Sequence, residues 1–85
     1  MKNQTSKQYE DQVEGRNSVL ELLESGKDIN KIYITRGEKH GSINKIIAKA
    51  RERKIIIVEK DKRQMQEIAQ TENYQGVIAD RKSVV

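Results

Sequence analysis

The amino-acid sequence predicts an α/β fold, a three-layer α/β/α sandwich built on a small mixed, mostly parallel sheet of four strands. Segments with the apolar period of a helix alternate with short β-branched segments between residues 13 and 79. Right-handed crossover connections would place the helices on both faces of the sheet. Ile, Leu and Val supply 20 of the 85 residues, enough for one aliphatic core, whereas Phe and Trp are absent. A chain of this length has room for a single domain.

The chain begins with a polar segment, followed by a helical pattern. Residues 1–12 contain no Ile, Leu or Val, so we expect a flexible polar tail and a first short strand near Val13. Ser18 and Glu21 have the spacing of a capping box, and Gly26 is a suitable helix stop. The apolar residues between these signals share one side of a helix: Val19, Leu20, Leu22 and Leu23.

Two predicted strands flank the clearest helical signal in the chain. Residues 31–35 are β-branched or aromatic after the first residue and predict a strand that ends at Arg36 and Gly37. Ser42 is expected to be the N-cap of the next helix. The apolar stripe of that helix consists of Ile43, Ile46, Ile47 and Ala50. The run 55–58 is entirely β-branched and predicts a central strand buried on both faces.

The last third of the chain predicts a third helix and a final strand. Asp61 and Gln64 again have the spacing of a capping box. A turn over residues 71–76 then leads into a strand over 77–79. The apolar stripe of the helix consists of Met65, Ile68 and Ala69. We expect residues 13–82 to form the folded domain, and residues 83–85 to mark the point where a longer chain was cut.

Composition excludes several classes of protein and favours one kind of partner. The 17 Lys and Arg residues outnumber the 13 Asp and Glu residues, which gives a net charge of +4 and a pI near 9.4. A basic domain of this kind is typical of polyanion binding, because phosphate contacts release counterions from nucleic acid. Cys is absent, and the single His40 cannot build a cluster, so structural zinc is excluded. The chain has no apolar run long enough for a membrane span or a signal segment, so we expect a cytoplasmic protein without a membrane partner.

The sequence contains no set of residues typical of catalysis. His40 and Ser42 are close in sequence, but a loop histidine beside a helix N-cap explains them better than a nucleophile and its base. The five glycines match neither the dinucleotide-binding nor the P-loop pattern. A free-standing small-molecule enzyme is therefore the weakest of the functional hypotheses.

Two polar loops are the better candidates for a binding site. In open α/β sheets, ligands bind outside the carboxyl ends of the strands, where loops enter helix N-termini. The loop 14–18 carries Arg16 and Asn17 there, and the loop 36–42 carries a second basic cluster. That cluster consists of Arg36, Lys39 and His40. Arg offers a planar fork of donors to phosphate, although both loops could instead be charged turns facing solvent. The turn 73–76 joins this edge only if the final strand runs antiparallel to the others.

The two ends of the domain carry a family resemblance. The segment 14–23, with sequence EGRNSVLELL, resembles the E-G-R-x-x-V opening of the substrate-binding domain of SpoU/TrmH-type RNA ribose 2′-O-methyltransferases. The segment 73–79, with sequence NYQGVIA, is similar to the family motif N-H-Q-G-V-x-A, from which Tyr74 departs in place of His. The resemblance runs from Val13 to Asp80. It adds Gln75 and Gly76 to Arg16 and Asn17 as candidate RNA-binding residues.

The resemblance implies a fold, a partner and a role. The fold would be similar to that of the kink-turn-binding ribosomal proteins. The domain would hold rRNA, or alternatively tRNA, for a separate knotted SPOUT catalytic domain that uses S-adenosylmethionine. This chain itself would need no cofactor, and the parent enzyme would be a homodimer. The alternative is a protein-interaction module that docks against its own catalytic domain or a second subunit.

Overall fold

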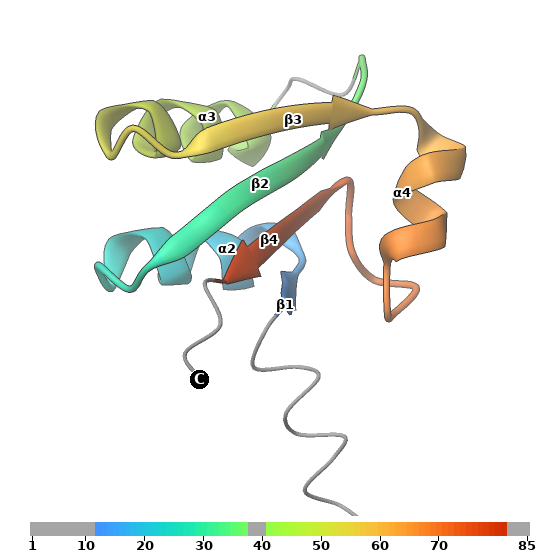
Figure 1. Cartoon of the computed structure of the whole chain (residues 1–85), viewed down its shortest axis with the longest axis horizontal. Coiled ribbons are helices and arrows are strands. Elements are labelled where there is room, and N and C mark those ends of the chain that lie inside the picture. Colours follow the sequence, from blue (N-terminus) through green and yellow to red (C-terminus); the bar gives the residue numbers. More distant parts are fainter. Residues whose placement is uncertain (1–11, 38–40, 82–85) are drawn as a thin grey trace, which may run out of the picture.

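A computed structural model describes residues 12–37 and 41–81 as a four-stranded mixed sheet with three helices (Figure 1). The elements in chain order are β1 (Gln12–Glu14), α2 (Arg16–Glu24), β2 (Ile29–Thr35), α3 (Ser42–Glu52), β3 (Ile56–Lys60), α4 (Lys62–Ile68) and β4 (Val77–Arg81). The predicted order of strands and helices is confirmed. Of the predicted tail over residues 1–12, Gln12 begins β1 and the rest lies outside the described residues, as does the predicted cut at 83–85. None of the helices in the described ranges is long and apolar enough to cross a membrane.

The sheet has the strand order β1-β4-β2-β3, in which β4 lies antiparallel to both of its neighbours. Only β2 and β3 pair in parallel, so the predicted mixed sheet is confirmed but its mostly parallel pairing is wrong. The connection between β3 and β4 stays where β3 ends, because α4 lies there (Figure 1) and Gly76 O, just before β4, accepts a 3.0 Å hydrogen bond from Thr35 N at the end of β2. The chain therefore enters β4 from the edge at which β3 ends and runs back along β2.

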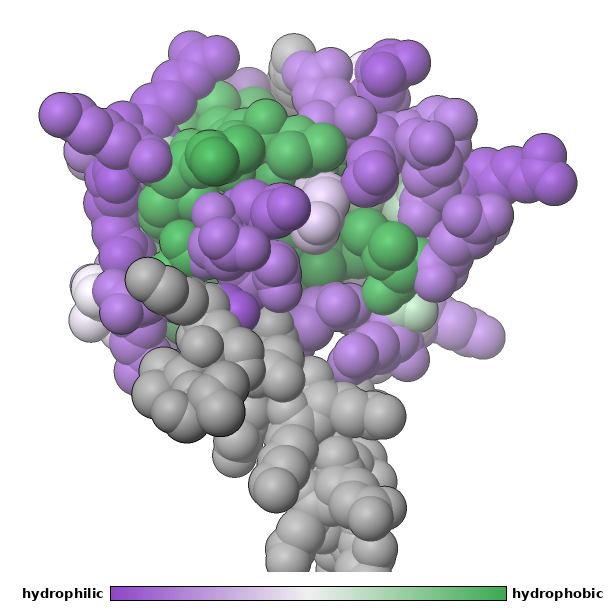
Figure 2. Space-filling view, in the orientation of Figure 1, coloured by the Kyte–Doolittle hydropathy of each residue, from purple (hydrophilic) through white to green (hydrophobic). Residues whose placement is uncertain are grey.

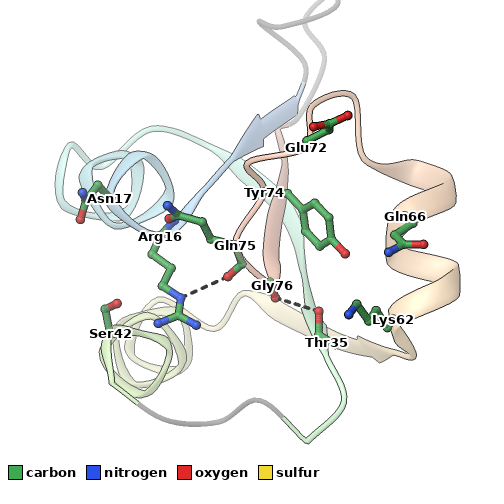
Figure 3. A pocket seen from close by; sticks show the side chains of 10 residues that line it. All are labelled: Arg16, Asn17, Thr35, Ser42, Lys62, Gln66, Glu72, Tyr74, Gln75 and Gly76. Carbon is green, nitrogen blue, oxygen red and sulfur yellow. Dashed lines mark hydrogen bonds between the residues drawn. The ribbon is translucent and has the colours of Figure 1, made fainter.

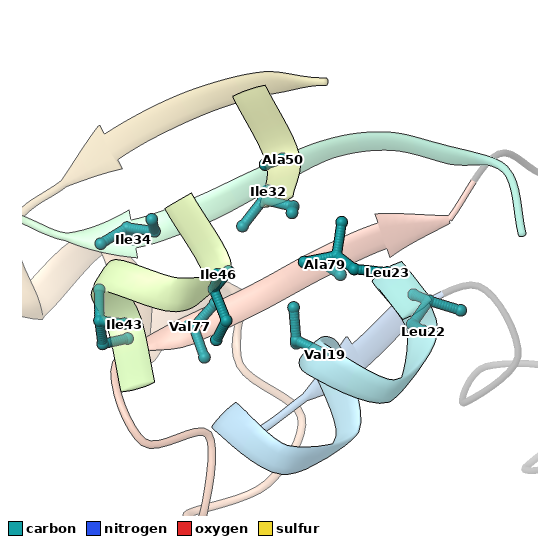
Figure 4. Close-up of a cluster of buried hydrophobic side chains, with 10 residues drawn as sticks. All are labelled: Val19, Leu22, Leu23, Ile32, Ile34, Ile43, Ile46, Ala50, Val77 and Ala79. Atoms are coloured by element: carbon teal, nitrogen blue, oxygen red, sulfur yellow. The ribbon is translucent and has the colours of Figure 1, made fainter. Parts of the chain in front are cut away.

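The main core lies between the sheet and the pair α2 and α3 (Figure 4). Alternate residues of β2 and β4 point toward these helices, which contribute their predicted apolar stripes. The buried cluster consists of Val19, Leu22, Leu23, Ile32, Ile34, Ile43, Ile46, Ala50, Val77 and Ala79. Ile78 points to the other face and is also fully buried, as is Met65 of α4. The helix α4 contacts β2 and β3.

The position of β3 corrects another expectation. The run 55–58 predicts a central strand buried on both faces, but β3 begins at Ile56 and lies at an edge of the sheet. Ile57 packs against the core on the side of the helices. Ile56, with the opposite orientation, is 63% exposed. A β-branched run suits an edge strand as well as a central one, so sequence alone does not separate the two.

Two predicted helix starts are also wrong. α2 begins at Arg16 with Gly15 as its N-cap, so Ser18 and Glu21 lie inside the helix and form no capping box. α3 has Gly41 rather than Ser42 as its N-cap. Neither helix start has a capping hydrogen bond from its own N-cap side chain, since glycine has none. The backbone N–H groups of these first turns therefore receive no hydrogen bond from an N-cap side chain.

The other predicted helix signals are confirmed. At the start of α4, Asp61 Oδ1 accepts a 2.8 Å hydrogen bond from Gln64 N, and Gln64 Oε1 accepts one of 3.3 Å from Asp61 N. This reciprocal pair is a capping box. Gly26 follows the C-cap of α2 with a φ of +78°, as a helix stop requires.

The packing predicts a contrast between two isoleucines. Ile46→Ala removes a fully buried side chain from the interface of α3 with the sheet, and we expect it to lower the free energy of unfolding by about 2–5 kcal/mol. Ile56→Ala is the matched control, since its side chain is mostly exposed, and should cost less than about 1 kcal/mol. Urea denaturation measures both. Equal losses would contradict the assignment of the core to the helix-covered face.

Candidate functional site

The strand directions bring four segments of the chain to one edge of the sheet. β1, β2 and β3 end there, and β4 begins there because it runs antiparallel to its neighbours. Because β4 is antiparallel, the turn 73–76 lies at the same edge as the loops 14–18 and 36–42. An open pocket of about 660 Å³ lies at this edge (Figure 3). Its walls are formed by Arg16, Asn17, Thr35, Ser42, Lys62, Gln66, Glu72, Tyr74, Gln75 and Gly76.

The start of α2 is tied to the segment that precedes β4. Gly15 has a φ of +99°, and a Cβ atom there would lie 3.4 Å from the carbonyl oxygen of Asn73. The backbone N–H of Gly15 donates to Val77 O at 3.2 Å. The first residue of the helix, Arg16, donates from its backbone N to Gln75 Oε1 at 3.0 Å and from its Nε to Gln75 O at 3.1 Å. A side chain 59 positions away thus supplies the cap that the N-terminus of α2 lacks.

The turn before β4 has a shape that few residues adopt. Gln75 and Gly76 both have positive φ, +55° and +80°, and Val77 N donates to Tyr74 O at 3.1 Å. Two consecutive positive φ values are the requirement of a type I′ turn, and glycine at the second position avoids the steric cost. The carbonyl oxygen of Gly76 accepts from Thr35 N at 3.0 Å and Thr35 Oγ1 at 3.3 Å, which ties the turn to the end of β2.

The carboxylate of Glu14 holds the chain between α4 and this turn. It accepts hydrogen bonds from Gln70 N at 2.5 Å, from Thr71 N at 3.0 Å and from Thr71 Oγ1 at 2.7 Å. Gln12 Nε2 donates to it as well, at 2.6 Å. Burial by itself would raise the pKa of Glu14, but the hydrogen bonds from Gln70, Thr71 and Gln12 outweigh it and hold the pKa below the ordinary value of 4.5.

Most of the polar side chains around the pocket have no partner in the part of the chain that the structure describes. Among residues 12–37 and 41–81, six of the lining side chains make no hydrogen bond or ion pair: Asn17, Ser42, Lys62, Gln66, Glu72 and Tyr74. Figure 3 shows the ring of Tyr74 between the turn and α4, with Lys62 and Gln66 pointing toward it from α4. The pocket therefore offers free donors, free acceptors and one aromatic face to a ligand.

Two cations stand on opposite sides of the pocket. The guanidinium of Arg16 lies beside the start of α3, where its Nη1 would be 3.7 Å from a Cβ atom on Gly41. Lys62 faces it from the first turn of α4. Neither α2 nor α3 has an acidic residue in its first turn. The positive ends of these helices and the two cations together favour an anionic ligand, with Glu72 as the one carboxylate among the lining residues.

The sequence profile of a known family matches this chain. The family is described as the substrate-binding domain of RNA 2′-O ribose methyltransferases, and the match covers residues 12–84. The chain belongs to the SpoU family of RNA methyltransferase substrate-binding domains. A protein of Staphylococcus haemolyticus (strain JCSC1435), named as a TrmH family tRNA/rRNA methyltransferase, is 38% identical over 65 residues. That alignment covers 76% of this chain and 26% of the relative, so the chain spans about a quarter of the relative's length.

The predicted site residues of this SpoU substrate-binding domain fall into three groups. Arg16, Asn17, Gln75 and Gly76 line one pocket, although they come from opposite ends of the domain. Arg36 is exposed at the same edge, directly after Thr35, and its backbone N donates to Lys60 O at 2.8 Å. The other two predicted residues, Lys39 and His40, lie outside the described residues.

Sequence reasoning missed the wall of the pocket that α4 contributes. Lys62 and Gln66 are four residues apart, so they share one side of the helix. The capping box at Asp61 already located the first turn of α4 and could have placed both residues on one face. What it could not show is that the turn carrying Tyr74 would return to the same edge. The described ranges contain no group of three or more His, Cys, Asp or Glu side chains that could hold a metal ion.

The role of Glu14 predicts a pH dependence of stability. Because its pKa is lowered in the folded protein, its contribution is present above pH 4.5 and is lost as the pH falls through the folded-state pKa. Glu14→Gln keeps one acceptor oxygen but turns an NH₂ group toward N–H donors. We expect it to lower the free energy of unfolding at pH 7 by about 1–3 kcal/mol and to flatten the decline in stability below pH 4.5.

Urea denaturation at a series of pH values between neutral and acid conditions measures both effects. Glu21→Gln, on the exposed side of α2, is the control and should leave stability at pH 7 within about 0.5 kcal/mol. An acid decline in Glu14→Gln as steep as in the original chain would show that Glu14 does not carry this dependence.

Proposed function

We propose that this domain recognises RNA for a ribose 2′-O-methyltransferase and that the pocket described above is its contact with the RNA. One observation carries the proposal. The two segments with family motifs, Glu14–Arg16 and the turn 73–76, lock together at a pocket that is also lined by polar side chains without a hydrogen bond or ion pair among the described residues. Family membership supplies the class of ligand, since the family is described by its binding of the methyltransferase substrate.

The chemistry of the pocket suits an unpaired or exposed nucleotide. Arg16 and Lys62 would contact phosphate groups, Arg16 through its planar fork of donors and Lys62 as a point charge. Tyr74 presents an aromatic ring on which a base can stack. The free amide of Gln66 lies beside that ring and can bond to a base edge. Tyr74 would thus act by stacking or through its hydroxyl group, in place of the imidazole of the family motif.

The exposed loop after β2 would extend this surface. Arg36 is at the same edge as the pocket and has no ion-pair partner among the residues that the structure describes. We include Arg36, Lys39 and His40 as further RNA contacts, the last two on their sequence positions alone. Contacts of this kind contribute affinity through the RNA backbone and do not depend on base identity.

The chemistry of methyl transfer is assigned to the rest of the parent protein. The relative named as a tRNA/rRNA methyltransferase is about four times as long as its aligned part, so it has room for a second domain. We propose that residues 13–82 are the RNA-binding domain, followed in the parent by a SPOUT domain that binds S-adenosylmethionine and pairs with itself as a homodimer. The preferred substrate is rRNA, with tRNA as the alternative. This chain alone should transfer no methyl group.

The finer fold assignment is part of the same proposal. A three-layer α/β/α sandwich similar to the kink-turn-binding ribosomal proteins is supported by α4. That helix contacts β2 and β3 and buries Met65, whereas the main core lies on the side of α2 and α3. Such a fold would leave the loop edge of the sheet free for RNA.

The proposal predicts that Lys62 contributes to RNA binding without contributing to folding. Lys62 is exposed and has no partner within the described part of the chain, so Lys62→Ala should leave stability unchanged within about 0.5 kcal/mol. Its affinity for an rRNA hairpin should fall, and the slope of log K against log salt should decrease by about 1, the value for one lost phosphate contact. Fluorescence anisotropy at several salt concentrations measures both.

The matched control is Lys27→Ala, in the connection between α2 and β2 at the opposite edge of the sheet. It removes the same charge, so a loss of affinity equal to that of Lys62→Ala would indicate general electrostatic attraction and count against the pocket. Unchanged affinity in Lys62→Ala and in Arg36→Ala would favour the alternative function, docking against the catalytic domain or a second subunit.

A further inference from the structure

The face of the sheet opposite α2 and α3 is partly open over β2 and β3. Side chains alternate along each strand, and the register pairs Lys31 with Ile56, Tyr33 with Val58 and Thr35 with Lys60 on this face. Figure 1 shows α4 beyond the end of β3 and near the start of β4, to one side of the middle of β2 and β3. The hydrophobic surface at the upper left of Figure 2 lies over this part of the sheet. Among the described residues, Ile56 is the one large apolar side chain that is exposed.

An aromatic ring with two ammonium groups stands at the centre of this open face. Lys31 Nζ lies 5.8 Å and Lys60 Nζ 5.5 Å from the centroid of the Tyr33 ring. No carboxylate pairs with either ammonium group within the described ranges. Asp80 points to the same face opposite Lys31, and its carboxylate accepts a 3.1 Å hydrogen bond from Asn30 Nδ2. The centre of the face is therefore aromatic and positively charged.

The open face is continuous with the pocket at the end of the strands. Thr35 follows Tyr33 by two residues on the same side of β2 and lines the pocket. Lys60 pairs with Thr35, and Lys62 of the pocket follows Lys60 by two residues. Three cations, Lys62, Lys60 and Lys31, thus line the path from the pocket to the open face. Along β2, Lys31 lies about 13 Å from Thr35 at the pocket.

We propose that this open face is a second RNA contact, which binds an unpaired segment of the RNA as it leaves the pocket. One base of that segment stacks on Tyr33 against Ile56 and Val58, and phosphates on either side pair with Lys31 and Lys60. The attraction between an ammonium group and a ring is weak at an exposed site, so a base can replace one of the two lysines over the ring. The inference rests on the proposed function, because it takes the ligand of the pocket to be RNA.

The charge of the face favours RNA over a protein partner. The core of a protein–protein interface is depleted of lysine, because burying an unpaired ammonium group is costly. A protein docked on Ile56 and Val58 would bury Lys31 and Lys60 next to them. An RNA strand instead brings a phosphate for each ammonium group and a flat base for the ring, as in other proteins that bind single strands.

The test compares an RNA hairpin with the same hairpin carrying an unpaired extension of several nucleotides. The extension is placed at the 5′ end in one RNA and at the 3′ end in another. Fluorescence anisotropy with the complete 85-residue chain measures their affinities. We expect the extension at one end to tighten binding, and Tyr33→Ala to remove that gain, a loss of about five- to a hundredfold for one stacked base. Tyr33→Ala should leave the affinity for the hairpin without an extension unchanged.

Two further variants separate stacking from an effect on folding. Tyr33→Phe keeps the ring and should keep most of the gain from the extension. Lys60→Ala leaves the core untouched and should lower the salt slope by about 1 for the extended RNA only. Lys45→Ala, on the exposed side of α3, is the matched control for the loss of one charge. It should leave the affinity and the salt slope unchanged for both the hairpin and the extended RNA.

The outcomes are distinguishable. If neither RNA binds at low salt, the proposed function fails and this inference fails with it. If the hairpin binds but no extension adds affinity, or Tyr33→Ala keeps the gain, only the inference is overturned. Sedimentation analysis adds a third outcome. If Ile56→Lys turns a self-associated chain into a monomer and leaves the gain from the extension intact, the face is a protein contact and the inference is wrong.

Discussion

The pocket depends on the contact between the start of α2 and the segment that leads into β4. Glu14 holds the backbone of residues 70 and 71, and Gly15 allows the close approach of Asn73. Arg16 donates hydrogen bonds to Gln75 from both its backbone and its side chain. Three consecutive residues thus hold a segment almost sixty positions away. The E-G-R sequence and the second motif are consequently the two halves of one structural unit.

This unit explains why a small domain with a modest core can present an ordered polar pocket. The main core lies between the sheet and α2 and α3, and the buried Met65 anchors α4, the helix that carries Lys62 and Gln66. The order of the edge comes from backbone hydrogen bonds to Gly76 and from the carboxylate of Glu14. Such bonds leave the side chains of Lys62, Gln66 and Tyr74 without a partner among the described residues, and so available to a ligand. The same edge continues onto the open sheet face around Tyr33, so one RNA could contact both surfaces.

The apolar period of the sequence was sufficient to predict the order of the elements, since each depends on residues close in the chain. The cap at Asp61 and the stop at Gly26 were predictable for the same reason. The start of α2 was not, because its cap is Gln75, which sequence neighbours cannot reveal. The direction of β4 was not predictable either, because it depends on contacts between residues far apart in the sequence, such as that of Thr35 N with Gly76 O. Four residues of the pocket were predicted from motifs and loops. The contribution of α4 was not predicted, because it depends on the direction of β4.

The most direct test of this account follows the backbone amide NMR signals of the chain while an rRNA hairpin is added. If the interlocked motifs form the RNA site, the signals that shift at low salt should belong to residues 14–17, 35–37, 62–66 and 72–76. These shifts should weaken together as salt is raised. Shifts confined to the outer faces of α2 and α3, with the loop edge unchanged, would contradict the account.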